Sequence, residues 1–304
     1  MQDDKFLLSE FRKAFLRNAN EAVVDLDESF KPKFDFQVQR FEDVLMNTNR
    51  VIPPNRWSHY RIGLLREGGG EFLTGIYDFK ASRNTLVVIP SRVITSSKNW
   101  TLDTKGYFLV FNIHFFLQNN FSHKFIESKK ILNPSIRPNV QLTDEQAEEI
   151  AGIFETLLKE KQLKGNYREE LIALKILELI IISERIFEEE NIFEESIPSI
   201  DLIKKFLDLL DINLLKMHAV KFYADQLAVH PNYLNSLIKK HTGLTAKEAI
   251  QNRLLLETKY LLHSTNLTIK EISSYLGFND PNYFTVFFKR FENISPANYR
   301  SSFL

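Results

Sequence analysis

Two short stretches near the end of the sequence place polar side chains on one face of a predicted helix. In the first, residues 232–241, the apolar side chains Leu234, Leu237 and Ile238 share the opposite face. The polar side chains are Asn232, Asn235, Ser236 and Lys239. Asparagine pairs with adenine through two hydrogen bonds, serine bonds to several base edges, and lysine bonds to guanine or phosphate. This stretch therefore predicts a helix that contacts DNA bases; the alternative is an ordinary solvated helix face.

The second stretch, residues 281–291, has a similar outward face with one apolar member. Its outward residues are Asn282, Thr285 and Val286. Val286 has no hydrogen-bonding side chain, so it either contacts a thymine methyl group or makes no base contact. Phosphate contacts position a protein on DNA without specifying sequence. The basic residues predicted to make them are Lys239, Lys240, Lys289 and Arg290.

Each stretch is the second helix of a predicted helix–turn–helix unit. The first unit spans residues 220–243 and the second spans residues 268–291. Pro231 and Pro281 fall in the first helical turn, where proline removes no intrahelical hydrogen bond. Asp280 precedes the second of these helices, where a carboxylate accepts from unpaired amides. These local signals predict two copies of one DNA-binding unit.

A predicted helix over residues 245–262 joins the two units. At about 1.5 Å per residue, a helix of about 18 residues is roughly 27 Å long. One turn of B-DNA is about 34 Å, the separation of successive major grooves on one face. The length therefore suits one chain that presents two recognition helices to neighbouring grooves.

An ordered series of residues extends this pattern over about 200–302. It consists of Ala224, Leu227, Tyr233, Leu234, Leu237, Ile238, Lys239, Lys240, Thr242, Gly243, Arg253, Leu261, Leu262, Ile269, Lys270, Glu271, Ile272, Leu276, Gly277, Phe278, Tyr283, Phe284, Phe287, Phe288, Lys289, Ile294, Ser295, Pro296, Tyr299 and Arg300. The series resembles the DNA-binding domain of the AraC/XylS family of transcription regulators. The resemblance implies a sequence-specific DNA-binding regulator in which Asn232 and Ser236 face the bases.

Three positions depart from the family pattern. His230 stands where serine is usual and is expected to cap its helix less well. Asn293 replaces a usual glycine, and asparagine tolerates the left-handed backbone conformation best among the substitutes. Val286 stands where a polar or basic residue is frequent, which weakens the case for hydrogen-bonded recognition by the second unit.

From about residue 34 to 116 the apolar period changes to two, which is typical of strands. Residues 58–66 and 72–79 each alternate between two faces. Gly68–Gly70 between them predicts a hairpin turn, and it lacks the Lys-Ser/Thr of a phosphate-binding loop. Short strands with regular turns predict an antiparallel barrel or sandwich. The N-terminal sensor of the AraC/XylS family is often a cupin-like barrel, which this region resembles weakly.

His59 and His114 are the histidines that a metal site in this region would use. A metal-binding cupin has a His-X-His sequence, a spaced glutamate and a later histidine, whereas His59 stands alone and Thr95 lies where a later ligand is expected. We therefore expect no metal, no cofactor and no catalysis; a cupin-type enzyme with an appended DNA-binding module is the alternative. Apolar walls with a few polar groups suit a small molecule. The candidate ligand-binding residues are His59, Arg61 and Asn112.

Helical periodicity returns after the predicted strands. Thr143 and Gln146 form a predicted capping box, and a very apolar helix follows at about residues 167–189. Such a helix must bury most of its surface. In the AraC/XylS family these helices often form the dimer contact, so we predict a homodimer; packing on the strands of the same chain is the alternative. Residues 188–199 are a predicted linker, and residues 1–20 a predicted short helix.

Composition limits the functional classes. The 304-residue chain has 39 Lys or Arg and 39 Asp or Glu, so its net charge does not indicate nucleic acid. The charges are uneven: residues 216–304 carry eleven basic and six acidic residues, whereas residues 144–195 carry six basic and fifteen acidic ones. A basic C-terminal region fits phosphate contact. The chain has no cysteine, which excludes disulfides and thiol chemistry, and we expect neither a signal peptide nor a membrane span.

Together these observations predict an α+β multidomain protein. Residues 1–135 are predicted to form a β-rich sensor with a cupin-like antiparallel barrel, residues 136–196 a helical dimerisation segment and linker, and residues 197–304 an all-α domain with two helix–turn–helix units. The predicted function is a ligand-responsive, sequence-specific transcription regulator in the cytoplasm. The predicted partners are double-stranded DNA, a small-molecule effector, a second copy of the chain and RNA polymerase.

Overall fold

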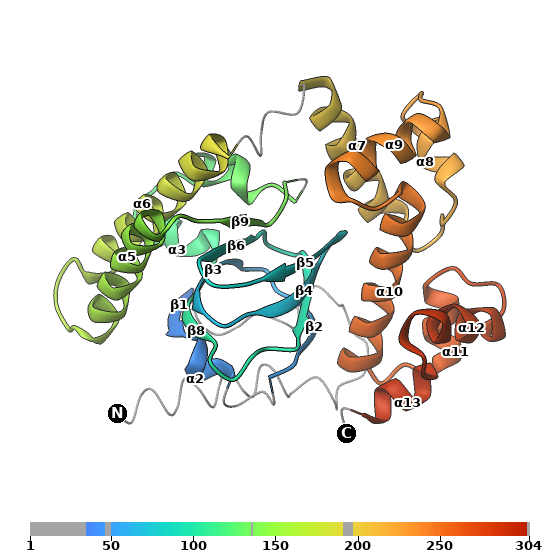
Figure 1. The fold of residues 1–304 in the computed structure, drawn as a ribbon, viewed down its shortest axis with the longest axis horizontal. Helices are drawn as coiled ribbons and strands as arrows, with labels where there is room; N and C mark the ends of the chain where they lie inside the picture. Colours follow the sequence, from blue (N-terminus) through green and yellow to red (C-terminus); the bar gives the residue numbers. More distant parts are fainter. Residues whose placement is uncertain (1–34, 46–49, 135, 191–196, 303–304) are drawn as a thin grey trace. The chain divides into compact units, whose positions relative to one another are not determined.

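The computed structural model describes residues 35–45, 50–134, 136–190 and 197–302 (Figure 1). The helix predicted over residues 1–20 and half of the predicted linker lie outside these ranges. The chain divides into two compact units, one made of residues 33–52 and 56–200 and the other containing residues 201–304.

The N-terminal unit contains two antiparallel sheets. The five-stranded sheet has the order β1-β8-β3-β6-β9, and the four-stranded sheet has the order β2-β7-β4-β5. The strands are β1 (Phe36–Arg40), β2 (Ile52–Arg56), β3 (Tyr60–Glu67), β4 (Gly70–Thr74), β5 (Tyr77–Ala81), β6 (Thr85–Ile89), β7 (Ile94–Lys98), β8 (Lys105–Phe111) and β9 (Asn139–Gln141). The predicted β-rich region is confirmed, but its described strands form two sheets and not one closed barrel.

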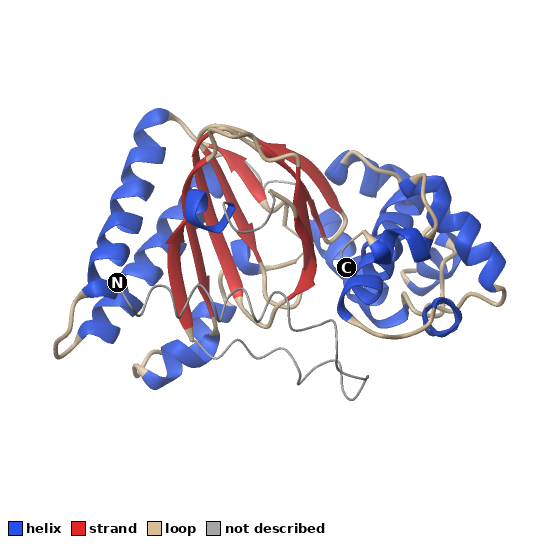
Figure 2. Cartoon of the chain, turned by 90° about the horizontal axis from the view of Figure 1, so that it is seen from below, coloured by secondary structure: helices blue, strands red, loops and turns tan. Residues whose placement is uncertain are grey.

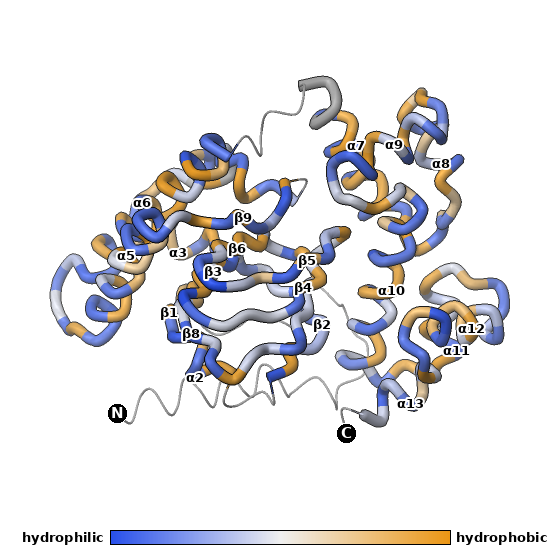
Figure 3. The backbone as a smooth tube through the Cα atoms, viewed as in Figure 1, coloured by the Kyte–Doolittle hydropathy of each residue, from blue (hydrophilic) through white to orange (hydrophobic). Residues whose placement is uncertain are grey.

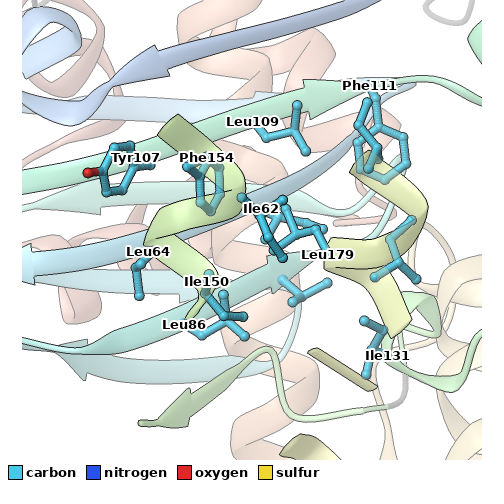
Figure 4. Close-up of a cluster of buried hydrophobic side chains, with 14 of the residues drawn as sticks. Ile62, Leu64, Leu86, Tyr107, Leu109, Phe111, Ile131, Ile150, Phe154 and Leu179 are labelled. Atoms are coloured by element: carbon cyan, nitrogen blue, oxygen red, sulfur yellow. The ribbon is translucent and has the colours of Figure 1, made fainter. Parts of the chain in front are cut away.

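The five-stranded sheet is buried on both faces. One face packs on α5 (Asp144–Gln162) and α6 (Arg168–Glu189), which lie along it in Figure 2. Ile62 and Leu86 of the sheet and Ile150 of α5 belong to this core (Figure 4). The other face meets the four-stranded sheet through a second cluster that includes Leu65 and Trp100. The alternation predicted for residues 58–66 is therefore confirmed.

The predicted turns differ from the observed ones. The segment from Gly68 to Gly70 connects β3 to β4, which lie in different sheets, so it is not a hairpin. The hairpin joins β4 and β5 instead, where Gly75 has a φ of +58° and Phe72 pairs with Phe79. Residues 72–79 are therefore two strands, because a positive φ at Gly75 allows a tight turn that an uninterrupted strand lacks.

The helices α5 and α6 pack on the sheet of their own chain, as the alternative interpretation of this segment held. Thr143 and Gln146 form the predicted capping box at the start of α5. Tyr107 of β8 stacks on Phe154 with 5.2 Å between ring centroids, and its hydroxyl donates to Glu155 Oε1 at 2.6 Å. Figure 3 shows hydrophobic residues interspersed with hydrophilic ones along both helices, as expected for helices with one buried face.

Short helices complete the N-terminal unit. They are α2 (Phe41–Leu45), α3 (Ile113–Gln118), α4 (His123–Glu127) and the 3₁₀ helix η2 (Lys130–Leu132). Among the described helices, none combines the length and the apolar character that crossing a bilayer requires.

Residues 201–302 of the C-terminal unit form helices joined by loops and turns, with no strand among them. Its helices are α7 (Ile197–Asn213), α8 (Val220–Gln226), α9 (Pro231–Thr242), α10 (Ala246–Ser264), α11 (Ile269–Tyr275), α12 (Pro281–Glu292) and α13 (Pro296–Ser301). The pair α8–α9 lies at one end of α10, and α11–α12 lies at the other end (Figure 1). These two pairs are the predicted helix–turn–helix units.

The helix caps agree with the local sequence signals, with one difference. Asp280 Oδ1 accepts from Asn282 N at 2.8 Å. His230 also caps its helix, because its Nδ1 accepts from the amide of Asn232 at 3.2 Å. An imidazole nitrogen therefore replaces the usual serine oxygen as the acceptor.

We predict that His230→Ala lowers the free energy of unfolding by about 1 kcal/mol, because the amide of Asn232 loses its acceptor. His230→Ser retains the acceptor and should cost only a few tenths of that. Urea unfolding of the full chain measures both, with Lys240→Ala on the exposed side of the same helix as the control. Equal losses for alanine and serine would show that the ring acts by packing and not as a cap.

Candidate nucleic-acid interface

The helices α9 and α12 have the same pattern of buried, outward and capping residues, offset by fifty positions in the sequence. Leu234 and Phe284 are fully buried at equivalent positions, as are Ile238 and Phe288. Each helix begins with proline, at Pro231 and Pro281. The equivalence covers sequence, burial and caps, so each helix presents a corresponding face to solvent.

The outward face of α9 is mostly as predicted. Asn232, Ser236, Lys239 and Lys240 are exposed. Asn235 is only half-buried, and its Oδ1 is buried without a hydrogen-bond partner among the described atoms. Its amide therefore turns partly inward, so the expectation that Asn235 projects freely with the others is not met.

The outward face of α12 has the same layout with different chemistry. Asn282, Lys289 and Arg290 are exposed, and Val286 is 63% exposed. Thr285 is half-buried, and its hydroxyl donates to the carbonyl oxygen of Pro281 at 2.9 Å. The second helix thus offers fewer free hydrogen-bonding groups between its ends than the first.

Two exposed tyrosines are not among the DNA-contacting residues that the sequence predicted. Tyr233 is 52% exposed and Tyr283 is 68% exposed. They occupy equivalent positions next to the outward asparagines. A tyrosine hydroxyl can donate to a phosphate oxygen, and the recurrence of tyrosine at the fifty-residue offset is the sequence signal that could have identified the pair.

The helix α10 holds both units and is buried along most of its length. Arg253 Nη1 donates to Glu257 Oε2 at 2.9 Å, and Arg253 Nη2 donates to Asp211 Oδ1 of α7 at 3.2 Å. Burial alone would lower the pKa of Arg253, but the two carboxylates raise the pKa above its ordinary value. At the other end of α10, Lys259 pairs with Glu292 of α12 at 2.6 Å.

The second helix–turn–helix also packs against the segment that precedes α8. Gly277 has a φ of +75°, and a Cβ there would lie 2.3 Å from the carbonyl oxygen of Leu215, so only glycine fits. The His218 ring contacts Phe278 with 5.3 Å between centroids. Burial lowers the pKa of His218. These contacts fix the turn of the second unit within the C-terminal unit.

The candidate ligand-binding residues lie in the N-terminal unit, and the structure brings two of them together. Asn112 Nδ2 lies 3.4 Å from His59 Nε2 and donates to Asp35 Oδ1 at 3.0 Å. Asn112 also caps α3 through Phe115 N, which gives it a structural role. His59 is buried.

Arg61 lies inside the N-terminal unit, on the face of β3 that meets the four-stranded sheet. It is buried, and Nη2 donates to the carbonyl oxygen of Val93 at 2.9 Å. The guanidinium carbon lies 5.5 Å from the ring centroid of Trp57. Burial lowers the pKa of Arg61 to about 9.

Gln37 and Gln39 share this inner face, although neither was a candidate residue from the sequence. Gln37 and Arg61 both pair with Val110 of β8, so the three residues form one row across the sheet. Gln37 is 4% exposed. Neither polar atom of its side chain has a hydrogen-bond partner among the described atoms. The sequence contains a signal for this placement, because Gln37 and Gln39 alternate with Phe36, Val38 and Arg40 and would lie on one face of a strand.

The two histidines considered for a metal site have different surroundings. His59 is buried, whereas His114 is exposed on α3 and its Nε2 lies 2.8 Å from Gln118 Nε2. Within the described ranges, no three His, Cys, Asp or Glu side chains come together as a metal site would require.

A family model described as a helix-turn-helix domain matches residues 223–302. This range holds most of α8 and all of α9 to α13, including both recognition helices. The match identifies residues 223–302 as a helix-turn-helix domain. The resemblance given by the ordered residue series is therefore confirmed for this part of the chain.

Curated relatives are similar over a longer stretch. The HTH-type transcriptional activator RhaR of Escherichia coli O139:H28 (strain E24377A / ETEC) is 25% identical over 158 residues, which is 51% of this chain and 54% of that protein. RhaR of Shigella dysenteriae serotype 1 (strain Sd197) is 26% identical over 158 residues. The chain thus spans about half the length of the curated relatives it matches.

Among solved structures, the wild-type ToxT of Vibrio cholerae strain SCE256 bound to an unsaturated fatty acid aligns with 87% of this chain and 94% of its own, at 13% identity and a TM-score of 0.44. The DNA-binding domain of AdpA in complex with a target DNA aligns with 36% of this chain and 94% of its own, at 19% identity and a TM-score of 0.31.

Proposed function

We propose that this chain is a sequence-specific DNA-binding transcription regulator. The observation that carries the proposal is the helix-turn-helix domain with two equivalent recognition helices joined by α10. At 19 residues, α10 is about 28 Å long, close to the roughly 34 Å between successive major grooves. Its relatives over half the chain are transcriptional activators.

The proposed contacts divide into base contacts and phosphate contacts. Asn232 and Ser236 of α9 are exposed near its N-terminal end, the part of a recognition helix that reaches base edges. Asn235 would need to rotate its amide outward to join them. The residues proposed for phosphates are exposed at the C-terminal ends of α9 and α12. They are Lys239, Lys240, Lys289 and Arg290.

We predict that Asn232→Ala costs on the order of 1–3 kcal/mol on its preferred site and relaxes the preference at one base position. Lys240→Ala should instead weaken binding to all sequences alike and reduce the salt dependence. Fragments selected from genomic DNA by the full chain supply the site. Fluorescence anisotropy of both variants on this site and on scrambled DNA, at two salt concentrations, measures the difference.

Tyr275→Ala, an exposed tyrosine outside both recognition helices, serves as the control for this comparison. Equal losses on specific and scrambled DNA for Asn232→Ala would remove its base-contacting role. Failure of the full chain to prefer any fragment over random competitor would contradict the proposed function itself.

The N-terminal unit is proposed to bind a small-molecule effector. The support is the inner face of the five-stranded sheet, where Gln37 and Arg61 are buried side by side across Val110. An unpartnered buried amide costs roughly 1–3 kcal/mol, and a polar ligand or an ordered water would offset that cost. His59 and Asn112 are proposed as further contacts. An effector regulates DNA binding only through different affinities for two states of the protein.

We predict that Gln37→Leu abolishes the effector's stabilisation of the protein while raising the melting temperature of the free protein, because it removes a buried unsatisfied amide. Thermal shifts with a panel of small polar and anionic metabolites identify the effector on the unmodified chain. Gln118→Leu on the exposed side of α3 is the matched control. An unchanged effector shift in Gln37→Leu would exclude this face as the binding site.

The chain is also proposed to form a homodimer through the outer face of α6. Leu171, Leu174 and Ile181 are exposed there, and Glu178 between them is half-buried. Their spacing of three and four residues is that of a helix seam that packs on a second helix. We also propose that the chain contacts RNA polymerase and is located in the cytoplasm, as expected of a transcription regulator.

We predict that Leu174→Glu combined with Ile181→Glu converts the dimer to a monomer, because charge in an apolar seam is unfavourable. Sedimentation equilibrium measures the mass of the full chain. Leu163→Glu, at an exposed leucine just after α5, tests whether the added charge alone has this effect. A dimer that survives the double substitution would place the interface elsewhere.

A further inference from the structure

The two recognition helices differ at few outward positions. Across the fifty-residue offset, Asn232 matches Asn282, Tyr233 matches Tyr283, and Lys239 matches Lys289. The outward positions between them do not match. Asn235 and Ser236 of α9 correspond to Thr285 and Val286 of α12. The two helices therefore share the same flanking outward residues and differ in the chemistry of the two outward side chains between them.

The change replaces hydrogen-bonding groups by methyl groups. Val286 has no polar atom, and Thr285 uses its hydroxyl on the carbonyl oxygen of Pro281 at 2.9 Å. Ser236, at the position equivalent to Val286, is exposed and carries a hydroxyl. The middle of α12 thus offers an exposed apolar side chain, Val286, beside a threonine whose hydroxyl is already hydrogen-bonded within the helix.

Packing within the C-terminal unit does not account for Val286. The buried face of α12 is supplied by Phe284 and Phe288, which are fully buried, and Val286 is 63% exposed on the other side. The equivalent serine shows that the fold accepts a polar residue at this position. A solvent-exposed β-branched apolar residue also gains nothing in helix propensity.

The major groove offers one apolar feature for such a side chain. Among the four bases, only thymine presents a methyl group there, at C5, and the other groups that distinguish the base pairs are hydrogen-bond donors and acceptors. A valine against a donor or acceptor would displace water without replacing its hydrogen bond, which is unfavourable. The same side chain therefore favours thymine and disfavours the alternatives.

We propose that the second helix–turn–helix unit recognises thymine methyl groups through Val286, with the methyl group of Thr285 beside it, whereas the first unit recognises bases by hydrogen bonds. This inference rests on the proposed DNA-binding function and specifies how one of its two contact surfaces discriminates bases. The operator half-site bound by α12 accordingly contains a thymine whose methyl group contacts the protein.

Replacement of thymidine by deoxyuridine tests the inference. Deoxyuridine pairs with adenine and keeps the O4 acceptor, and it lacks only the C5 methyl group. The full chain is measured by fluorescence anisotropy on its selected DNA site with each thymidine replaced in turn. At one or two positions we expect binding to weaken about three- to fivefold, the factor for loss of one buried methyl group.

A double-mutant cycle connects that loss to the side chain. Val286→Ser and Val286→Ala should bind the thymidine and deoxyuridine sites almost equally at those positions. Ser236→Val is the matched reverse change, and it should create sensitivity to the methyl group in the half-site bound by α9. Thermal melting of each variant verifies the fold, and the exposed position of both residues leads us to expect small changes.

The outcomes separate the inference from the function on which it rests. Specific DNA binding with no methyl sensitivity anywhere, or with sensitivity unchanged in both Val286 variants, would overturn the inference and leave the proposed function intact. Absence of any sequence preference in the unmodified chain would overturn both. Sensitivity that disappears with Val286→Ser and Val286→Ala supports the inference.

Discussion

Burial of α10 on nearly every side is the constraint that unites the helices of the C-terminal unit. Leu256 and Leu261 on this helix are fully buried, and α8, α9, α11 and α13 all contact it. Helices on each side of α10 therefore share one core with it. Sharp bends in a helix have local causes such as proline or glycine, and α10 contains neither, so the separation of the two units is set by its length. Two recognition helices on one short chain thus keep a defined spacing.

Buried charge reinforces this arrangement. Arg253 and Glu257 are both buried on α10, one turn apart, and Arg253 also reaches Asp211 of α7. Removing charges from water is costly, and a buried pair often adds little net stability. Loss of either partner leaves an uncompensated charge, however, so the pair disfavours arrangements in which α7 and α10 separate. Its contribution here is to the uniqueness of the packing.

In the N-terminal unit, the five-stranded sheet is covered on both faces. All five residues of β6 are buried, as expected of a strand between two layers. Gln37, Gln39 and Arg61 are among the buried polar residues of this unit, and all three lie on the face that meets the four-stranded sheet. Natural cores tolerate few such groups, and their concentration on one face separates this region from the apolar core under α5 and α6.

Prediction succeeded where the signals are local. Caps, first-turn prolines and the left-handed residues Gly243 and Asn293 act within one helical turn, so the sequence alone located both helix–turn–helix units. It failed where partners are distant. Gly68–Gly70 has the composition of a hairpin turn, yet the choice of β5 and β7 as partners of β4 depends on strands further along the chain. Strand alternation defines two faces but does not say which neighbour covers each.

The sequence by itself determined the helices of the C-terminal unit, their caps and the repeat that relates α9 to α12, because helix formation and capping depend on residues within a few positions of one another. Tertiary structure decided that the strands form two sheets, that Gln37 lies inside while Asn235 turns partly inward, and that Val286 is exposed. Those outcomes depend on which distant surfaces pack together. The burial of a side chain is a property of its neighbours in space, and neighbours in sequence do not fix it.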